Sequence, residues 1–253
     1  MTLLSLVDGI VYGPVSSRRF GRSLGLNLMP PDRKVCPLNC LYCHFGWTTD
    51  HVADASELAA ALPTPSQVAG ALDRALERAG SLDAITFSGN GEPTLHPDFP
   101  EIVNSVRDVR DRRAPTVPVQ ILSNSATLQR PEVLDALRSL DRRVMKLDAG
   151  TQETFGRINR PLPGSTLRTI VEGLRSLGGV TIQTALMTGG ADNCRRSEVT
   201  AWLEQLKLIN PIQVQLYTLD RPTADSGLVG VARERMHQIA EAVAAAWFDV
   251  RVF

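Results

Sequence analysis

Three cysteines crowd into one short segment, Cys36-Pro-Leu-Asn-Cys40-Leu-Tyr-Cys43. Thiolates separated by three and then two residues, on a loop that wraps inward, can ligate three irons of one four-iron, four-sulfur (4Fe-4S) cluster. The remaining iron then has no protein ligand and is open to a chelating molecule, near which Tyr42 can pack. The sequence therefore predicts a 4Fe-4S cluster on Cys36, Cys40 and Cys43.

Two other interpretations of these cysteines stay open. Structural zinc needs a fourth ligand, for which His44 and the isolated Cys194 are available. However, zinc sites usually use paired two-residue spacings, and this segment has a single such pair. Buried cysteines without metal are disfavoured by the dense spacing. A disulfide framework would spread its pairs along the chain, so the clustering indicates a metal in a reducing compartment.

The overall composition restricts the class of protein. The chain has 253 residues, 43% of them hydrophobic, which is enough for a sizeable core. Lys+Arg and Asp+Glu are 27 each, so net charge provides no general attraction to nucleic acid, although Arg18, Arg19 and Arg22 form a local basic cluster or a solvated surface. The apolar segment 1–11 is interpreted as a strand rather than a signal peptide, and no apolar run reaches membrane-spanning length. We expect a cytoplasmic protein.

Short apolar or β-branched runs alternate with segments of helical periodicity, in about six β/α units. This alternation predicts an α/β fold with a parallel sheet. We expect one domain over 1–253, with an N-terminal extension at about 1–22, a C-terminal helix and strand at about 231–253, and a mobile loop at 221–230. Strands are expected at 24–28, 84–87, 119–122, 144–147, 181–186 and 212–216, and helices at 65–79, 98–109, 131–140, 165–177, 197–208 and 232–246.

Polar or glycine residues follow nearly every expected strand directly, as at 88–91, 123–125, 148–150 and 188–190. In barrels and doubly wound sheets, the loops at the carboxyl ends of the strands form the active site. The sequence therefore places its polar residues on the face where chemistry would occur.

The cysteine spacing resembles the signature of the radical S-adenosylmethionine (SAM) superfamily. One β/α unit later, Gly89-Asn90-Gly91-Glu92-Pro93 resembles the family's glycine-glutamate-proline motif, whose backbone holds the SAM amino group, and glycine lets a backbone approach a ligand closely. The resemblance implies a partial (β/α)6 barrel, a 4Fe-4S cluster, SAM and an external one-electron reductant of the flavodoxin or ferredoxin type. Further cofactor contacts implied by resemblance or position are Tyr42, Ser123, Asn124, Lys146, Asp148 and Gln183, with Leu216 and Tyr217 available to pack on adenine.

A narrower resemblance is to the branch of the tRNA wyosine-forming enzyme, 4-demethylwyosine synthase. It covers most of the chain and is carried by the stretches 12–19, 23–27, 146–150, 155–161 and 217–222. The wyosine enzyme also has a second cysteine cluster upstream, whereas no cysteine precedes Cys36 here. An active-site amine for a pyruvate-type Schiff base has few candidates, because the lysines are Lys34, Lys146 and Lys207. The wyosine reaction itself is therefore not transferred to this chain.

The resemblance implies reductive cleavage of SAM and hydrogen abstraction from a substrate. The substrate has three alternatives: RNA or a nucleotide, a small metabolite or peptide, and a glycyl-radical enzyme. The segment Tyr42-Cys43-His44 resembles that of activases of glycyl-radical enzymes. The neutral net charge of the chain does not favour tRNA. A zinc-binding module is the non-enzymatic alternative. No catalytic residue is assigned. Candidates for substrate contact are Arg18, Arg19, Asn159, Arg160 and Arg221, and for proton transfer His44 and His96, each with a surface or structural role as the alternative.

Overall fold

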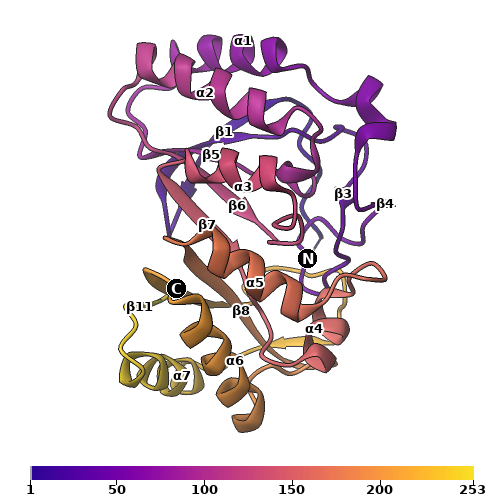
Figure 1. Ribbon diagram of the computed structural model, residues 1–253, viewed down its shortest axis with the longest axis vertical. Helices are drawn as coiled ribbons and strands as arrows, with labels where there is room; N and C mark the ends of the chain where they lie inside the picture. The colour runs from indigo at the N-terminus through magenta and orange to yellow at the C-terminus, as the bar shows by residue number, and fades with distance from the viewer. Residues whose placement is uncertain (1) are drawn as a thin grey trace.

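One sheet of nine strands organises residues 2–253, the part of the chain that the computed structural model describes (Figure 1). Short apolar runs build its centre; the segment AITF, for example, is buried at all four positions. Such continuous burial is typical of strands covered on both faces. The strands are β1 (Val11–Ser17), β2 (Gly21–Leu26), β5 (Ala84–Phe87), β6 (Val119–Ser123), β7 (Arg142–Lys146), β8 (Thr181–Gly189), β9 (Gln213–Thr218), β10 (Leu228–Gly230) and β11 (Val250–Val252).

The sheet is mostly parallel. Its order is β1-β2-β5-β6-β7-β8-β9-β11, and each neighbouring pair from β2 to β11 is parallel. The first strand, β1, runs antiparallel to β2, and β10 pairs antiparallel with β8. Parallel neighbours bring their carboxyl ends to one edge of the sheet, so the polar residues that follow the strands gather there.

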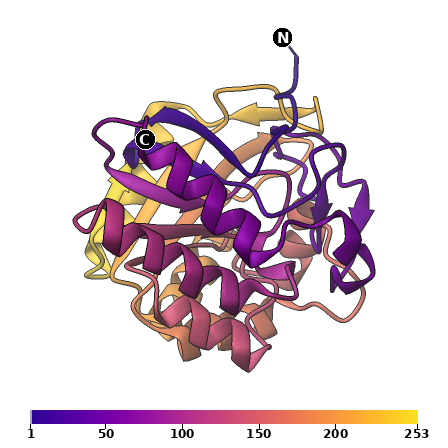
Figure 2. The same cartoon turned by 90° about the horizontal axis from the view of Figure 1, so that it is seen from above.

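A layer of helices covers the outside of the sheet. An outer helix follows each of β2, β5, β6, β7, β8 and β9, as the six expected β/α units require, although β7 is first followed by the short helix α4 (Gln152–Asn159). In Figure 1 the outer helices run from α1 at the top to α6 and α7 at the bottom, and Figure 2 shows the same layer from above. This arrangement confirms the α/β prediction. The six helices are α1 (Pro65–Leu76), α2 (Phe99–Arg113), α3 (Pro131–Arg138), α5 (Leu167–Leu177), α6 (Arg196–Ile209) and α7 (Arg233–Ala245).

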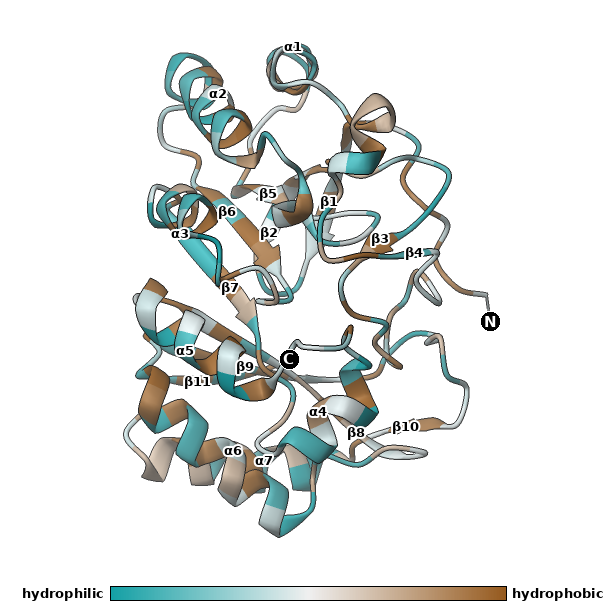
Figure 3. Ribbon diagram, turned by 45° about the vertical axis from the view of Figure 1, so that its right-hand side comes forward, coloured by the Kyte–Doolittle hydropathy of each residue, from teal (hydrophilic) through white to brown (hydrophobic). Residues whose placement is uncertain are grey.

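Local sequence explains where these helices begin and which face they bury. Thr64 forms a capping box with Gln67 at the start of α1, and Pro65 occupies the first turn, where its missing N–H costs nothing. The buried residues of that helix are Val68 and Leu72, four positions apart on one face. In Figure 3 the central strand β6 is largely hydrophobic, whereas helices such as α2 and α3 combine hydrophilic and hydrophobic turns.

The expectation of a strand over 1–11 is wrong for the described residues 2–10, which have no regular structure before β1 begins at Val11. Met1 lies outside the described residues. The backbone of this segment bonds to loops instead of a strand: Val7 N–H donates to Asn90 Oδ1 over 2.8 Å, and Leu4 N–H donates to the His44 carbonyl over 2.9 Å. The N-terminal extension expected at 1–22 therefore also supplies β1, the outer strand of the sheet.

The segment 221–230, expected to be an irregular mobile loop, contains β10. Two backbone N–H groups of this segment bond to the cysteine loop: Ala224 N–H donates to the Cys43 carbonyl over 3.0 Å, and Asp225 N–H to the Leu41 carbonyl over 2.9 Å. These long-range bonds order a stretch whose composition alone suggested mobility. The C-terminal helix and strand expected at 231–253 are α7 and β11.

Several short elements lie at one side of the sheet and hold the cysteines. β3 (Val35–Cys36) pairs in parallel with β4 (Asp50–His51), on the right in Figure 1, and α4 (Gln152–Asn159) lies below them. Two 3-10 helices, η1 (Ser56–Ala61) and η2 (Pro93–Leu95), complete the set.

Candidate functional site

The three cysteines of the predicted cluster lie on β3 and on the loop that follows it. Cys36 is the last residue of β3 and is 8% exposed, Cys40 is 9% exposed, and Cys43 is partly exposed. A turn closes the loop, since Cys43 N–H donates to the Cys40 carbonyl over 3.2 Å. The loop therefore presents two buried thiols and one that is more accessible to solvent.

The glycine-glutamate-proline motif packs directly against the cysteine strand. Val35 N–H donates to the Asn90 carbonyl and Glu92 N–H donates to the Val35 carbonyl, both over 3.0 Å. Gly91 has φ +145°, and a Cβ at this position would lie 1.7 Å from the Val35 carbonyl oxygen. From its motif, this glycine is expected to let a ligand approach the backbone closely. The structure instead shows close approach to the residue before Cys36, so Gly91 also positions the cysteine loop.

The C-terminal end of α4, which the sequence argument did not predict, reaches the same loop. The Ile158 and Asn159 carbonyls each accept a hydrogen bond of 2.9 Å, from Leu41 N–H and Asn39 N–H respectively. Thr151 caps this eight-residue helix by accepting a hydrogen bond from Thr154 N–H. The otherwise free carbonyls at the helix end are therefore satisfied by the cysteine loop.

Two asparagine amides donate to the cysteine sulfurs. Asn124 Nδ2 lies 3.2 Å from Cys36 Sγ, and Asn159 Nδ2 lies 3.4 Å from Cys40 Sγ. Asn124 is itself held by Glu92, whose Oε2 accepts from its backbone N–H over 2.7 Å. Hydrogen bonds to sulfur ligands tune an iron–sulfur centre, so both amides are in positions to act on a cluster.

A buried ion pair lies next to this loop. Lys146 Nζ is 2.8 Å from Asp148 Oδ1, and the Asp148 side chain is 0% exposed. Asp148 Oδ2 accepts from the Tyr42 hydroxyl over 2.5 Å and from Asn159 Nδ2 over 3.0 Å, while Lys146 Nζ also donates to the Tyr217 hydroxyl over 2.7 Å. The structure thus joins Tyr42, Lys146 and Asp148, which were assigned separately from the sequence, in one hydrogen-bonded group.

Burial perturbs the protonation equilibria of the site. It raises the pKa of the Cys36 thiol, and it raises the pKa of Cys40 to about 11. Burial, followed by the charge of Asp148, raises the pKa of Tyr42 well above its ordinary value. Burial likewise raises the pKa of Glu92, although several hydrogen bonds oppose this shift. In the absence of metal, the deeply buried thiols therefore favour their neutral form.

Lys34 belongs to the site although the sequence argument did not place it there. Its side chain is buried, with the residue 4% exposed, and its Nζ donates to the Gly46 carbonyl over 2.9 Å. Burial lowers the pKa of Lys34, whereas Cys43, Cys36 and Cys40, in their thiolate form, raise it by more, so the pKa of Lys34 is raised when the cysteines are ionised. The sequence feature that could have placed Lys34 in the site is its position two residues before Cys36.

Other predicted cofactor contacts have structural partners. The Asn90 side chain is occupied by backbone groups, since its Nδ2 donates to the Val7 carbonyl over 2.9 Å and to the Pro30 carbonyl over 3.0 Å. Ser123 Oγ accepts from Ser125 N–H over 3.1 Å, and Gln183 Nε2 donates to Gln215 Oε1 over 3.4 Å. Gly89 has φ +129° and lies against Asn27.

The arginines considered for substrate contact have different surroundings. Arg18 forms an exposed ion pair with Asp220, whereas Arg19 stacks over the Tyr217 ring at 4.6 Å. Arg160, in the left-handed conformation at the end of α4, stacks over Trp47 at 4.9 Å, and Arg221 is exposed. Of the original set, the structure brings Asn159 into contact with a cysteine.

Both candidate proton carriers bond to backbone groups. His44 Nδ1 lies 3.0 Å from the Pro222 carbonyl. His96 is 1% exposed; its Nε2 lies 3.0 Å from the Pro63 carbonyl and its Nδ1 accepts from Asp98 N–H over 3.0 Å. Burial lowers the pKa of His96. This geometry indicates a structural role for His96.

Among residues 2–253, no group of three His, Cys, Asp or Glu side chains is gathered as the ligand set of a single metal ion. Cys194, which was considered as a fourth zinc ligand, is buried on the connection between β8 and α6, with its Sγ 3.6 Å from Asn193 Oδ1. Burial raises its pKa to about 12. In the same range of residues, the structure contains no helix that is both long and apolar enough to span a membrane.

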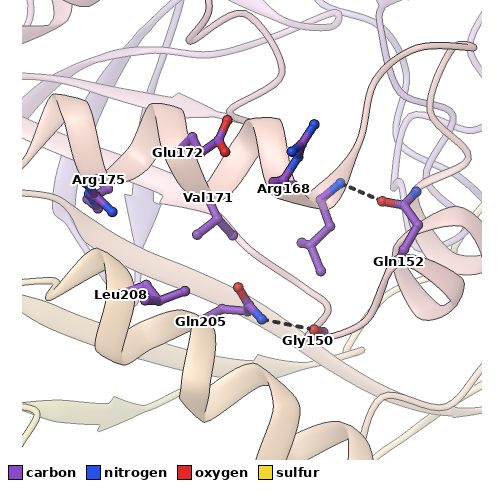
Figure 4. Close-up of a pocket in the computed structure, with 9 residues that line it drawn as sticks. Gly150, Gln152, Arg168, Val171, Glu172, Arg175, Gln205 and Leu208 are labelled. Atoms are coloured by element: carbon purple, nitrogen blue, oxygen red, sulfur yellow. Dashed lines mark hydrogen bonds between the residues drawn. The ribbon is translucent and has the colours of Figure 1, made fainter.

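Several hollows occur in the structure, and two of them lie near strands or helices of the barrel discussed above. A cavity of about 140 Å³ between β1, β2, β5 and β6 is lined by hydroxyl and aromatic groups, including Tyr12 and Ser88, with Arg19 at its wall. A larger groove of about 470 Å³ runs between α5 and α6 in the outer layer, with Val171 and Leu208 among its lining residues (Figure 4). None of the residues lining the outer groove belongs to the cysteine loop.

Comparison with known proteins gives a consistent family and fold. The model of the Radical SAM superfamily matches residues 34–216. A UPF0026 protein from Helicobacter pylori (strain J99) is 33% identical over 85% of this chain and 68% of its own length, and a UPF0026 protein from Synechocystis sp. is 30% identical over 84% and 76%. The match to the family model includes the cysteine loop.

Solved structures share the fold at low sequence identity. A radical SAM methyltransferase from Sphaerobacter thermophilus aligns with a TM-score of 0.64 at 18% identity, over 91% of this chain and 65% of the other. SuiB from Streptococcus suis bound to S-adenosylmethionine gives 0.64 at 12% identity, over 90% and 50%. TYW1 with a lysine-pyruvate adduct bound gives 0.63 at 16% identity, over 88% and 73%. The mostly parallel sheet is therefore the partial barrel that the sequence predicted.

Proposed function

The chain belongs to the radical SAM superfamily, and we propose that it holds a 4Fe-4S cluster on Cys36, Cys40 and Cys43 and cleaves SAM reductively to start radical chemistry. Family membership makes it an enzyme that uses SAM and an iron–sulfur cluster. The observation that carries the proposal is the convergence of two amide donors, Asn124 and Asn159, on the sulfurs of Cys36 and Cys40.

The residues around the cysteines fit such a cofactor. Asn159 Oδ1 is buried without a hydrogen-bond partner, although the amide nitrogen of the same side chain contacts Cys40. A buried acceptor of this kind needs a donor, which a bound ligand with amino or hydroxyl groups would supply. A cluster also binds each thiolate to a different iron, so the three sulfurs need not converge on one ion.

The resemblance assigns SAM to the residues that end the strands around the cluster. Those in the hydrogen-bonded group at the site are Tyr42, Lys146 and Asp148, and Asn124 reaches the same region from β6. Asn90 would act through its backbone, because its side chain is bonded elsewhere. The remaining proposed contacts are Gly89, Gly91, Glu92, Ser123 and Gln183.

When bound, the cluster and SAM would supply one-electron reductive cleavage of SAM and, from it, radical chemistry on a substrate. The protein binds, orients and shields these groups. Asp148 fixes the Tyr42 hydroxyl, the Lys146 ammonium and the Asn159 amide around one carboxylate. Burial of Cys36 and Cys40 limits access of water and oxygen. We infer that the electron comes from a flavodoxin- or ferredoxin-type donor.

We further propose that the chain lies in the branch of the wyosine-forming enzymes and modifies RNA or a nucleotide. This placement is supported by three of the resembling stretches, which meet at the site: 146–150 supplies Lys146 and Asp148, 155–161 supplies Asn159, and 217–222 supplies Tyr217. A peptide or small metabolite, or a glycyl-radical enzyme as partner, is the competing substrate class.

The cluster proposal is tested by anaerobic reconstitution, with iron and sulfide analysis and an assay of 5′-deoxyadenosine formed with SAM and dithionite. Cys40→Ala should lose most cluster iron and all SAM cleavage, because one iron loses its ligand. Cys194→Ala is the matched control: it also removes a buried thiol, but outside the cysteine loop, and should retain both properties. Wild-type cleavage by Cys40→Ala, or zinc without iron in the reconstituted wild type, would contradict the proposal.

The substrate proposal is tested by adding unmodified tRNA, nucleotides or peptides to the reconstituted enzyme. RNA or nucleotide should stimulate 5′-deoxyadenosine formation and gain a new mass by mass spectrometry. Stimulation and product formation with peptide alone would place the chain in the competing class, while leaving the cluster proposal intact.

A further inference from the structure

Lys34 is a buried cation with an unusual lack of counter-charge. The residue is 4% exposed, and the bond that its Nζ makes to the backbone is to the neutral Gly46 carbonyl. Lys146, the other lysine of the site, has a side chain that is 13% exposed and is by contrast paired with the Asp148 carboxylate at 2.8 Å. Within residues 2–253, Lys34 takes part in no salt bridge with a carboxylate. A buried ammonium without an anion is costly, so its retention calls for a partner.

The groups able to supply that partner are the cysteines. Lys34 Nζ donates to the Gly46 carbonyl over 2.9 Å, and Gly46 N–H in turn donates to the Cys43 carbonyl over 3.2 Å, so the ammonium lies against the turn that follows Cys43. The backbone of Lys34 is also fixed, because its carbonyl accepts from Thr49 N–H over 3.1 Å and from Asp50 N–H over 3.0 Å. Hydrogen bonds therefore fix both the backbone of Lys34 and its ammonium group beside the cysteine loop.

Cysteine thiols are neutral at pH 7, whereas cysteines that bind metal are thiolates. Three thiolates around a 4Fe-4S core with two positive charges carry a net charge of −1, and reduction by one electron makes this −2. A fixed cation nearby lowers the energy of both states, and it lowers the energy of the more negative state further. A bound cluster with its three thiolates would therefore provide the negative charge that Lys34 lacks, and this negative charge would be larger in the reduced cluster.

We propose that Lys34 is the counter-cation of the cluster, a positioning residue whose fixed positive charge favours the thiolate-bound cluster and its reduced state. This inference rests on the proposed function, since it requires a cluster on the three cysteines. It assigns to Lys34 a role in how readily the external donor can reduce the enzyme. No protonation change of the lysine is involved.

The first test needs no cluster. In the metal-free protein, Lys34→Met removes an uncompensated buried charge and should raise the melting temperature, by about 2 to 4 °C if about 1 kcal/mol of unfolding free energy is regained. Lys34→Gln is the second neutral variant, because it keeps an N–H donor for the Gly46 carbonyl. Lys207→Met is the matched control, since Lys207 is exposed on α6 and paired with Glu204. It should leave the melting temperature nearly unchanged.

The second test uses the reconstituted protein and a redox titration followed by electron paramagnetic resonance, without substrate. Lys34→Met should make reduction of the cluster about tenfold less favourable, a fall of 59 mV in midpoint potential for one electron. Lys34→Arg keeps the charge and should restore the wild-type value, and Lys207→Met should not change it. Loss of iron from both neutral variants but not from Lys34→Arg would equally support a requirement for the charge.

An unchanged midpoint potential in an iron-replete Lys34→Met protein would overturn the inference. So would a lower melting temperature for both neutral variants in the metal-free protein, or iron loss from Lys34→Arg as severe as from Lys34→Met, since both would indicate packing rather than charge. Failure of the proposed function looks different: the wild type would then bind no iron after reconstitution.

Discussion

The buried carboxylate of Asp148 is expected to be the most sensitive charge of the site. It is 0% exposed and accepts hydrogen bonds from Lys146, Tyr42, Asn159 and the Ala185 N–H, the last over 2.9 Å. Asp148→Asn keeps the shape but leaves the Lys146 ammonium buried without its anion. Removing one partner of a buried pair costs about 3 to 5 kcal/mol. At about 2 to 4 °C per kcal/mol, the melting temperature should fall by roughly 6 to 20 °C.

The assay is unfolding of the metal-free, reduced protein by heat, for the melting temperature, and by urea, for the free energy of unfolding, both followed by far-ultraviolet circular dichroism. A double variant, Asp148→Asn with Lys146→Met, removes both charges and should recover much of the lost free energy of unfolding. Asp135→Asn is the control, because Asp135 forms an exposed pair with Arg138 and should cost about 0 to 1 kcal/mol. The reasoning is refuted if Asp148→Asn costs no more than this control, or if the double variant is as unstable as Asp148→Asn alone.

Two further perturbations test other parts of the site. Gly91→Ala should lose most cluster iron, because its Cβ would lie 1.7 Å from the Val35 carbonyl oxygen and displace the cysteine strand. Gly80→Ala is the control: Gly80 also has a positive φ but has open space around it, so this variant should keep its iron. Equal iron contents in the two variants would show that the Gly91 contact can relax. His96 has a lowered pKa through burial, so the unfolded chain binds its proton more readily, and the free energy of unfolding should fall as pH drops from about 6.5 through the folded-state pKa. His96→Gln should flatten this fall in a pH series of urea titrations and exposed His237→Gln should not; identical slopes would contradict the assignment.

The sequence predicts much of the scaffold because burial dictates it locally. The run 84–87 is buried at every position and forms β5 over the predicted residues, and the start of α1 follows from Thr64, Gln67 and Pro65. The short helix α4 gives no comparable signal. It is eight residues long, and its C-terminal carbonyls are satisfied by Asn39 and Leu41 of a distant loop. Interactions of that kind are absent from local periodicity.

For the candidate site, too, some features can be predicted from the sequence and others cannot. Spacing predicts that the cysteines form a ligand set, because cysteines so close together in sequence are close in space. It does not reveal that Lys34 turns inward, since a lysine at this spacing is equally compatible with a solvent-exposed side chain. The sequence also does not show that the Asn90 side chain bonds to the Val7 and Pro30 carbonyls, which leaves only the backbone of Asn90 for the proposed cofactor contact. Those distinctions require the three-dimensional partners.

The cysteine loop has little regular structure after β3, yet its shape is fixed from outside. Val35, at its start, bonds to the segment after β5; Leu41 bonds to the end of α4 through its N–H and to Asp225 through its carbonyl; and Cys43 bonds to Ala224. Buried backbone groups must find partners, and here those partners come from three distant parts of the chain. A loop held at so many points cannot change its thiol positions without disturbing the barrel. These long-range bonds, which local sequence patterns do not reveal, therefore hold the loop in the fixed geometry that the proposed ligation of three irons would require.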